Sequence, residues 1–317
     1  MAKKVITSLN FDYRFEHNIE HLTRDLCEMY GYPKDIGIDV FDDPRLELER
    51  VITNFSLRTD IFDKEIYYMY GYPYPMPNTT LNRISTVLEL IARTISEALK
   101  GPSCRKHKKL AMSMSPGDII FSYNYDLLMD NALYDVGNFN DLGYLISFYR
   151  KLKEGKWTKT EENASEIVLV KLHGSLNWVR CNICGSTLML HQQKTGNWNN
   201  FISYSRYKCP KCRANSQYER LLVPPLLTKN YADRDINYLW FEAARLLKNV
   251  KKIVVIGYSL PKIDIASETL LRTLGKDLNN IPLTIVDPDP KVKSRFATIF
   301  NTKISEFKDL NHYLKSI

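Results

Sequence analysis

The stretch KKIVVIGYSL, residues 251–260, decides the fold class. Its centre, residues 253–256, is a continuous run of β-branched residues, and Gly257 ends it. Short apolar runs bounded by turn residues are typical of strands that are buried on both faces of a parallel sheet. Three runs of the same kind lie at residues 118–122, 167–172 and 282–287, and residues 5–9 form a weaker candidate strand.

Segments with helical spacing lie between these predicted strands. Residues 237–249 and 85–100 both place apolar residues every three or four positions, and Gly101 follows the second as a stop signal. Strands that alternate with helices predict an α/β fold, a Rossmann-like doubly wound parallel sheet.

Two segments interrupt this alternation. Residues 11–115 are expected to form a largely helical insertion, and residues 178–220 contain two cysteine pairs with little periodicity. We therefore expect a Rossmann-like domain built from residues 1–177 and 221–317, with an inserted zinc-ribbon module at residues 178–220.

Four of the six cysteines form two Cys-x-x-C pairs, Cys181 with Cys184 and Cys209 with Cys212, with 24 residues between the pairs. Two such pairs supply the four thiolates of a tetrahedral zinc site. Because a four-cysteine site has no open position, we expect the zinc to be structural and His173 not to be a ligand.

The charge balance of the 317-residue chain is basic, since 44 lysines and arginines exceed 36 acidic residues by 8. Basic runs such as residues 105–109 predict either solvated surfaces or contact with nucleic acid, directly or through a protein partner. The sequence shows no secretory signal and no apolar run of membrane-spanning length, so we expect a cytoplasmic protein with no membrane contact.

Polar residues follow each of the four stronger strand candidates. They are Asn124 and Asp126, then His173 and Ser175, then Gly257 and Ser259, and finally Asp287. Because the carboxyl ends of parallel strands share one edge, where open α/β sheets bind ligands, this set predicts a nucleotide site. Each residue alone also has a simpler structural interpretation: Asp126 as a helix cap, Asp287 as a turn cap and His173 as a structural histidine.

The order of these segments resembles the sirtuin family, and more closely the divergent sirtuin-like proteins of prokaryotic antiviral systems. The resemblance covers residues 117–290 and rests on FSYNYDLL (121–128), KLHGSLNW (171–178), the two cysteine pairs, LLVPPLL (221–227), KKIVVIGYSL (251–260) and LTIVDPDP (283–290). It implies a sirtuin-like fold, a structural zinc ion and NAD as the ligand.

The resemblance also implies residue roles. Asn124 and Asp126 would hold the nicotinamide-ribose end of NAD, and His173 would act as the general base toward a ribose hydroxyl. Gly257 and Ser259 would contact phosphate and ribose, and Asp287 would face the adenosine end.

Two departures from the family pattern bear on activity. The family's first strand leads into a Gly-Ala-Gly-x-Ser phosphate loop, whereas residues 5–12 contain no glycine. Met1-Ala2-Lys3-Lys4 is typical of a natural start, which favours loss of that loop over a start further upstream. Residues 223–231 also lack the Phe-Gly-Glu segment of protein deacylases.

These departures predict a catalytically degenerate subunit of an antiviral defence system that binds a partner such as a short Argonaute. The retained Asn124, Asp126 and His173 support an alternative, an active NAD hydrolase that causes abortive infection by NAD depletion. An NAD-dependent protein deacylase is the least favoured alternative.

Overall fold

The computed structural model describes residues 104–160, 163–190, 207–215, 218–224, 231–261, 264–274 and 280–317, together with three helical positions at 88, 92 and 95. Those three positions, all buried, fall within the helix predicted for residues 85–100. The candidate strand at residues 5–9, the glycine-free residues 5–12 and most of the predicted helical insertion lie outside the described residues.

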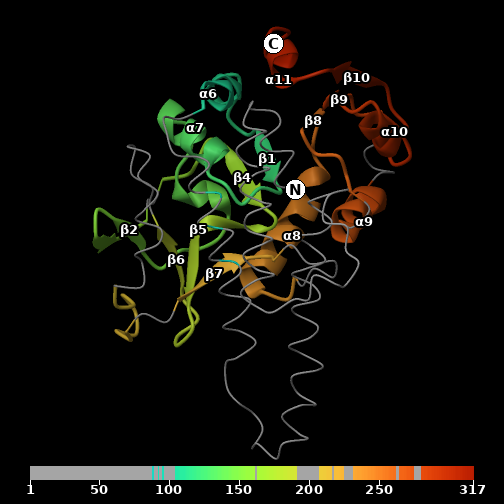
Figure 1. Cartoon of the computed structure of the whole chain (residues 1–317). Coiled ribbons are helices and arrows are strands. Elements are labelled where there is room, and N and C mark those ends of the chain that lie inside the picture. The colour runs from blue at the N-terminus through green and yellow to red at the C-terminus, as the bar shows by residue number, and fades with distance from the viewer. Residues whose placement is uncertain are drawn as a thin grey trace, which may run out of the picture.

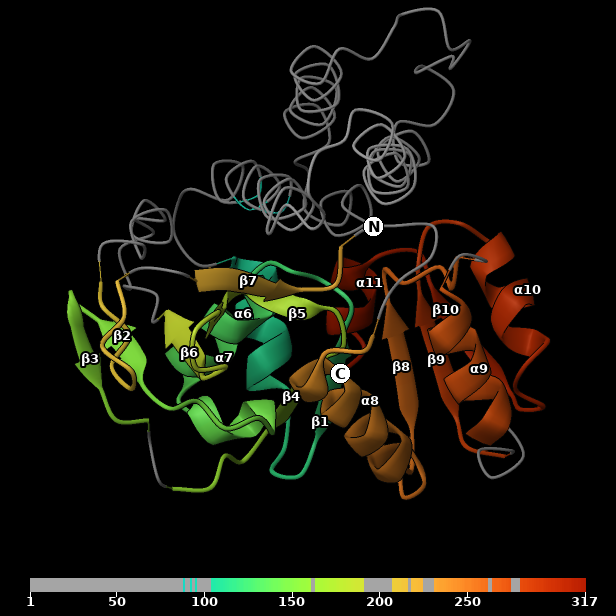
Figure 2. The ribbon, with the colours of Figure 1, turned by 90° about the horizontal axis from the view of Figure 1, so that it is seen from below.

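Five parallel strands carry the predicted nucleotide edge. β1 (Ile119–Ser122) pairs with β4 (Val168–Lys171), and β9 (Leu283–Val286) lies between β8 (Ile253–Ile256) and β10 (Ile304–Phe307). In both Figure 1 and Figure 2, these strands follow one another in the order β4, β1, β8, β9, β10. The predicted α/β fold with parallel strands is therefore confirmed, and β10 is an additional strand.

A second, five-stranded sheet carries the cysteine loops. Its order is β3-β2-β6-β5-β7, and its strands are β2 (Lys151–Lys153), β3 (Lys156–Thr158), β5 (Gly174–Cys181), β6 (Thr187–Leu190) and β7 (Tyr218–Leu222). β5 pairs antiparallel with both β6 and β7. The predicted module boundary at residue 178 falls inside β5, and β2 and β3 precede that boundary in the chain. The domain boundaries remain a prediction.

Helices cover the parallel strands. They are α6 (Arg105–Met112), α7 (Leu128–Val136), the 3₁₀ turn η2 (Asp141–Tyr144), α8 (Arg234–Leu247), α9 (Ile265–Leu274), α10 (Lys291–Ala297) and α11 (Leu310–Leu314). The helix predicted from the spacing of apolar residues at 237–249 corresponds to α8, which buries Leu239, Ala243 and Leu247. Among the described residues, no helix has both the length and the apolarity needed to cross a membrane.

Two apolar clusters hold these layers together. The first joins Leu133 of α7, Leu169 of β4 and Leu239 of α8. The second lies between β9 and α10, where Leu283 and Phe296 are buried. Phe121 of β1 packs against both clusters, so the β1–β4 pair and the β8–β9–β10 sheet share one interior.

Candidate functional site

His173 lies in the short turn where the chain leaves β4 and enters β5, and its side chain is 0% exposed. The next residue, Gly174, has a φ of +79°, and a Cβ built there would lie 2.0 Å from the backbone oxygen of Leu221. Only glycine therefore allows β5 to approach β7 this closely. The backbone oxygen of His173 also accepts a hydrogen bond of 3.0 Å from the N–H of Val223, which fixes the turn.

An acid and two hydroxyl groups surround the imidazole. Oδ1 of Asp264, which is also 0% exposed, lies 3.9 Å from Nε2 of His173. The Tyr258 hydroxyl donates a hydrogen bond of 3.1 Å to Oδ2 of Asp264. The Tyr231 hydroxyl lies 3.4 Å from the same Nε2 of His173. The arrangement is a buried carboxylate–imidazole pair with hydroxyl partners on both groups.

Aromatic rings from two strand ends and from α8 enclose this pair. Tyr123, just after β1, stacks on Tyr258, just after β8, with 4.1 Å between ring centroids, and meets the His173 ring edge-on at 5.4 Å. Trp240 of α8 lies 6.4 Å from the His173 ring and donates from Nε1 to the Leu172 oxygen at 3.0 Å. The carboxyl ends of β1, β4 and β8 therefore meet at His173.

Burial changes the acidity of the surrounding tyrosines. Burial raises the pKa of Tyr123 to about 12, against the opposing effect of a hydrogen bond with Ser267. Burial also raises the pKa of Tyr258, and nearby Tyr123 and Asp264 raise it further. The pKa of Tyr231 is raised by burial and by the charge of Asp264. All three hydroxyls therefore stay protonated near neutral pH, and the hydroxyl of Tyr258 donates to Asp264.

The residues predicted after β1 have different surroundings. Asn124 is partly buried, and its backbone N–H donates to Oγ of Ser122 at 3.2 Å. Its neighbours in sequence, Tyr123 and Tyr125, both have rings near His173. Asp126 is buried, and its Oδ1 accepts the N–H of Leu128 at 2.9 Å, at the start of α7. Burial raises the pKa of Asp126, with the charge of Lys171 opposing. This bond closes a turn just before α7, whose N-cap residue is Leu127, so Asp126 is not the helix cap itself.

The remaining predicted residues are spread along the same edge. Ser175 is fully buried on β5. Gly257 has a φ of +63°, in the left-handed region that favours glycine, and Ser259 accepts a hydrogen bond of 2.8 Å from Arg295 at its backbone oxygen. Oδ1 of Asp287 accepts the N–H of Asp289 at 2.9 Å, as in the turn-cap interpretation. Tyr258, between Gly257 and Ser259, is what connects this loop to His173.

Asp264 is the acidic member of this site, and sequence reasoning does not single it out. It lies 91 residues after His173, and its only local signal is an acid between Ile263 and Ile265. Its backbone oxygen accepts the N–H of Glu268 at 3.0 Å, so Asp264 also begins α9. Asp264 is buried beside His173 because the strand ends that carry the site meet in the fold. The spacing of residues along the chain does not reveal this meeting.

The four predicted zinc ligands lie together. All four Sγ atoms lie within 4.8 Å of one another, and the Cys181–Cys212 and Cys184–Cys209 pairs are both separated by 3.7 Å. A tetrahedral zinc ion with bonds of about 2.3 Å has sulfur–sulfur edges of about 3.8 Å. The cluster therefore has the donor set and the spacing for a structural zinc ion. His173 is not among the residues of this cluster, as expected.

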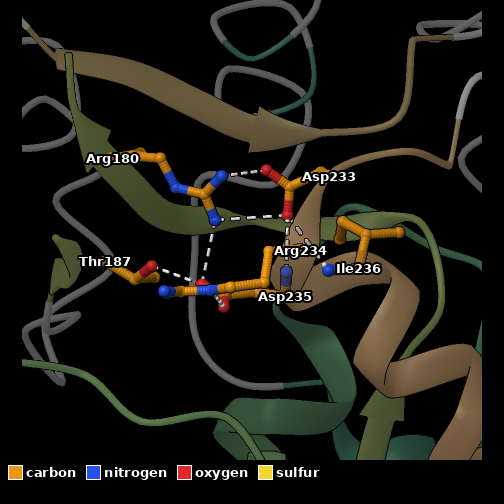
Figure 3. A network of polar contacts seen from close by, with 6 residues as sticks. All are labelled: Arg180, Thr187, Asp233, Arg234, Asp235 and Ile236. Atoms are coloured by element: carbon orange, nitrogen blue, oxygen red, sulfur yellow. Dashed lines mark hydrogen bonds and ion pairs between the residues drawn. The ribbon is translucent and has the colours of Figure 1, made fainter. Parts of the chain in front are cut away.

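A polar network joins the cysteine-bearing sheet to the helix that carries Trp240 (Figure 3). Arg180 of β5 binds Asp233 through Nη1, and its Nη2 donates to Oδ2 of Asp235 at 2.9 Å. Asp233 caps α8 by accepting the N–H groups of Asp235 and Ile236 at 2.8 and 3.1 Å. Thr187 of β6 also donates to Asp235. The guanidinium thereby fixes the start of α8 against β5 and β6.

Fold and site together define an α/β protein with a buried carboxylate–imidazole pair at a parallel-sheet edge and a four-cysteine cluster in an adjoining sheet. The sequence matches no protein-family model and no curated protein. The chain is similar to a solved structure from a study of sirtuin substrate affinity, with a TM-score of 0.41 and 14% identity over 82% of this chain and 87% of that one. It is similar to another from a study of the mechanism and regulation of Sir2 enzymes, with a TM-score of 0.41 and 14% identity over 95% and 94%.

Proposed function

We propose that the chain is a sirtuin-like protein that binds NAD and hydrolyses its nicotinamide–ribose bond at His173. The observation that carries this proposal is the buried Asp264–His173 pair where the carboxyl ends of β1, β4 and β8 meet. Buried ionisable pairs are costly to maintain in a fold, and they concentrate at functional sites. The resemblance of the sequence to sirtuins supplies the substrate.

The reaction would break the bond between the ribose C1′ and the nicotinamide nitrogen, and water would add at C1′. The products are nicotinamide, ADP-ribose and one proton. His173 would accept the proton of a ribose hydroxyl as positive charge develops on the sugar ring. Asn124 would hold the nicotinamide-ribose end of NAD, together with Asp126. Ser175, Gly257, Ser259 and Asp287 remain the proposed contacts to the rest of the nucleotide.

The test is nicotinamide release from NAD by the purified full chain, alone and with the protein encoded by a neighbouring gene. We expect His173→Ala to lower the rate by about 100-fold or more, which is the usual contribution of a general base. Asn124→Ala should also lower the rate strongly. His312→Ala is the matched control, because His312 lies exposed on α11 and pairs with Asp309, the N-cap residue of that helix. Release that survives in His173→Ala would contradict the proposal.

A second candidate is a non-catalytic subunit of a prokaryotic antiviral system that binds a partner such as a short Argonaute. Two observations favour this candidate. Residues 5–12 contain no glycine. The side chain of His173 is 0% exposed, so NAD reaches His173 only if the surrounding rings move apart. α6 adds exposed basic side chains at Arg105, Lys108 and Lys109, which suit contact with nucleic acid held by a partner. Absence of nicotinamide release with and without the partner, alongside a stable complex, is the result that favours this candidate.

A further inference from the structure

The carboxylate of Asp264 is directed at the ring of His173, away from solvent. Both side chains are 0% exposed, and Oδ1 of Asp264 lies 3.9 Å from Nε2 of His173. The other oxygen, Oδ2, accepts the Tyr258 hydroxyl at 3.1 Å. The capping contact of Asp264 with α9 uses its backbone oxygen, through the N–H of Glu268. The backbone oxygen of Asp264 thus contacts the start of α9, while its carboxylate faces His173 and Tyr258.

We propose that Asp264 is a positioning residue that orients the imidazole of His173 and selects its reactive ring nitrogen. A carboxylate facing Nε2 favours the tautomer that carries its proton on that nitrogen. Nδ1 is then the basic nitrogen, and the negative charge of Asp264 stabilises the imidazolium that forms when Nδ1 takes a proton. Tyr258 supports this arrangement by holding the second carboxylate oxygen.

The other groups described around the ring are uncharged. The Tyr231 hydroxyl faces Nε2 at 3.4 Å, and the rings of Tyr123 and Tyr125 lie against His173 from the end of β1. Burial raises the pKa of Tyr123, Tyr231 and Tyr258, so these groups remain neutral where histidine titrates. Among the groups named here, Asp264 is the one that supplies negative charge to the imidazole.

The first experiment reads the histidine itself and requires no catalysis. Long-range ¹H–¹⁵N NMR of the full chain, with the signal assigned through His173→Gln, reports the tautomer and the titration of the ring. We expect the Nε2-protonated tautomer in the native protein. In Asp264→Asn we expect a mixture of tautomers and a titration midpoint at lower pH, because the imidazolium loses its counter-charge. An unchanged tautomer and midpoint would overturn the proposal.

Two further variants separate positioning from folding. Tyr258→Phe removes the hydroxyl that holds Asp264 and should shift the tautomer in the same direction by a smaller amount. Asp141→Asn is the matched control, because Asp141 is also buried and is paired with Lys151 by a contact of 2.7 Å. It should leave the His173 signal unchanged. If Asp264→Asn fails to fold, Tyr258→Phe still decides: an unchanged signal in that variant counts against the proposal.

The second experiment depends on the proposed function and measures the pH profile of nicotinamide release. We expect Asp264→Asn to lower kcat by about 100-fold with little change in KM and to move the acidic limb to lower pH. A purely structural role for Asp264 would lower the amount of folded protein and leave the position of that limb unchanged. If the native chain releases no nicotinamide, the proposed function fails, while the NMR result still decides the role of Asp264.

Discussion

At the scale of single residues, Gly174 connects the sheet to the site. It has a φ of +79°, it pairs with Leu222 of β7, and it follows His173 directly. A methyl group at this position would meet backbone atoms of Leu221 and Leu222, which cannot turn away as a side chain can. The position of His173 therefore depends on a strand pairing that only glycine permits.

We predict that Gly174→Ala destabilises the fold by more than about 3 kcal/mol, because left-handed strain of about 1–2 kcal/mol adds to a backbone clash. Urea unfolding of the variant measures this loss. Gly137→Ala is the matched control, since Gly137 has a φ of +87° but nothing lies within 4 Å of its added Cβ. In that control the free energy of unfolding should fall only by the cost of left-handed backbone strain, about 1–2 kcal/mol. Equal losses in the two variants would show that the clash is relieved at no cost.

Single residues also show what the sequence alone predicts poorly. The double Cys-x-x-C spacing identified all four members of the cysteine cluster, because a metal knuckle is a local feature of the chain. Asp264 carries no such local signal, since its partner His173 is 91 positions away in sequence. Asp126 has two interpretations from sequence, a nucleotide contact and a helix cap, and the structure shows its carboxylate closing a turn one residue before the N-cap of α7.

At the scale of elements, buried strands were the most predictable features. The runs at residues 118–122, 167–172 and 282–287 extend at most one residue beyond β1, β4 and β9 at either end, because continuous apolar runs have few alternatives in an α/β fold. β10 was missed, since its two apolar residues, Ile304 and Phe307, are separated by two exposed polar residues and show neither a continuous run nor an alternation. β5 was missed as a strand because the His-Gly-Ser turn and the cysteine pair obscure its pattern.

The start of α8 is the junction between the two sheets, and acid should weaken it. Burial alone raises the pKa of Asp235, but the hydrogen bond from Thr187 and the guanidinium groups of Arg234 and Arg180 lower it overall. A lowered pKa means that the folded state favours the carboxylate. The resulting stability is present above the ordinary Asp pKa of 3.8 and is lost as the pH falls through the lower folded value.

We predict that Asp235→Asn costs about 2 kcal/mol near pH 7, where one partner of a largely buried ion pair is removed. The difference from the native protein should shrink as the pH falls below about 4. Urea unfolding over a pH series measures both effects. Arg234→Gln serves as the control, because that side chain is 78% exposed and its ion pair should contribute less than about 1 kcal/mol. A difference that stays constant with pH would mean that Asp235 does not titrate differently on unfolding.

At the scale of the whole molecule, β5 links the two chemical centres. It starts one residue after His173 and ends at Cys181, so the proposed base and the first cysteine of the cluster are attached to opposite ends of one strand. Arg180, next to Cys181, holds the start of α8, and Trp240 of that helix packs near His173. Zinc at the cysteine cluster would therefore stabilise the end of a strand whose other end positions the site.

We predict that the purified chain carries one zinc ion, and that removing it with a chelator lowers the thermal unfolding midpoint by more than about 5 °C. The reason is that a structural zinc site couples metal binding to folding, and the ion would join the loops at Cys181–Cys184 and Cys209–Cys212 through their four thiolates. Metal analysis by mass spectrometry gives the zinc content, and calorimetry gives the midpoint.

Cys212→Ser should lose the metal and reproduce the lower midpoint without chelator, because three remaining thiolates hold zinc more weakly than four. Cys104→Ser is the matched control, since Cys104 is a free cysteine at the start of α6 and outside the cluster. It should retain zinc and the native midpoint. A chain that binds no zinc, or whose midpoint is unchanged by its removal, would contradict a structural role for the cluster. In that case the Arg180 network, rather than a metal, would have to hold this end of β5 in place.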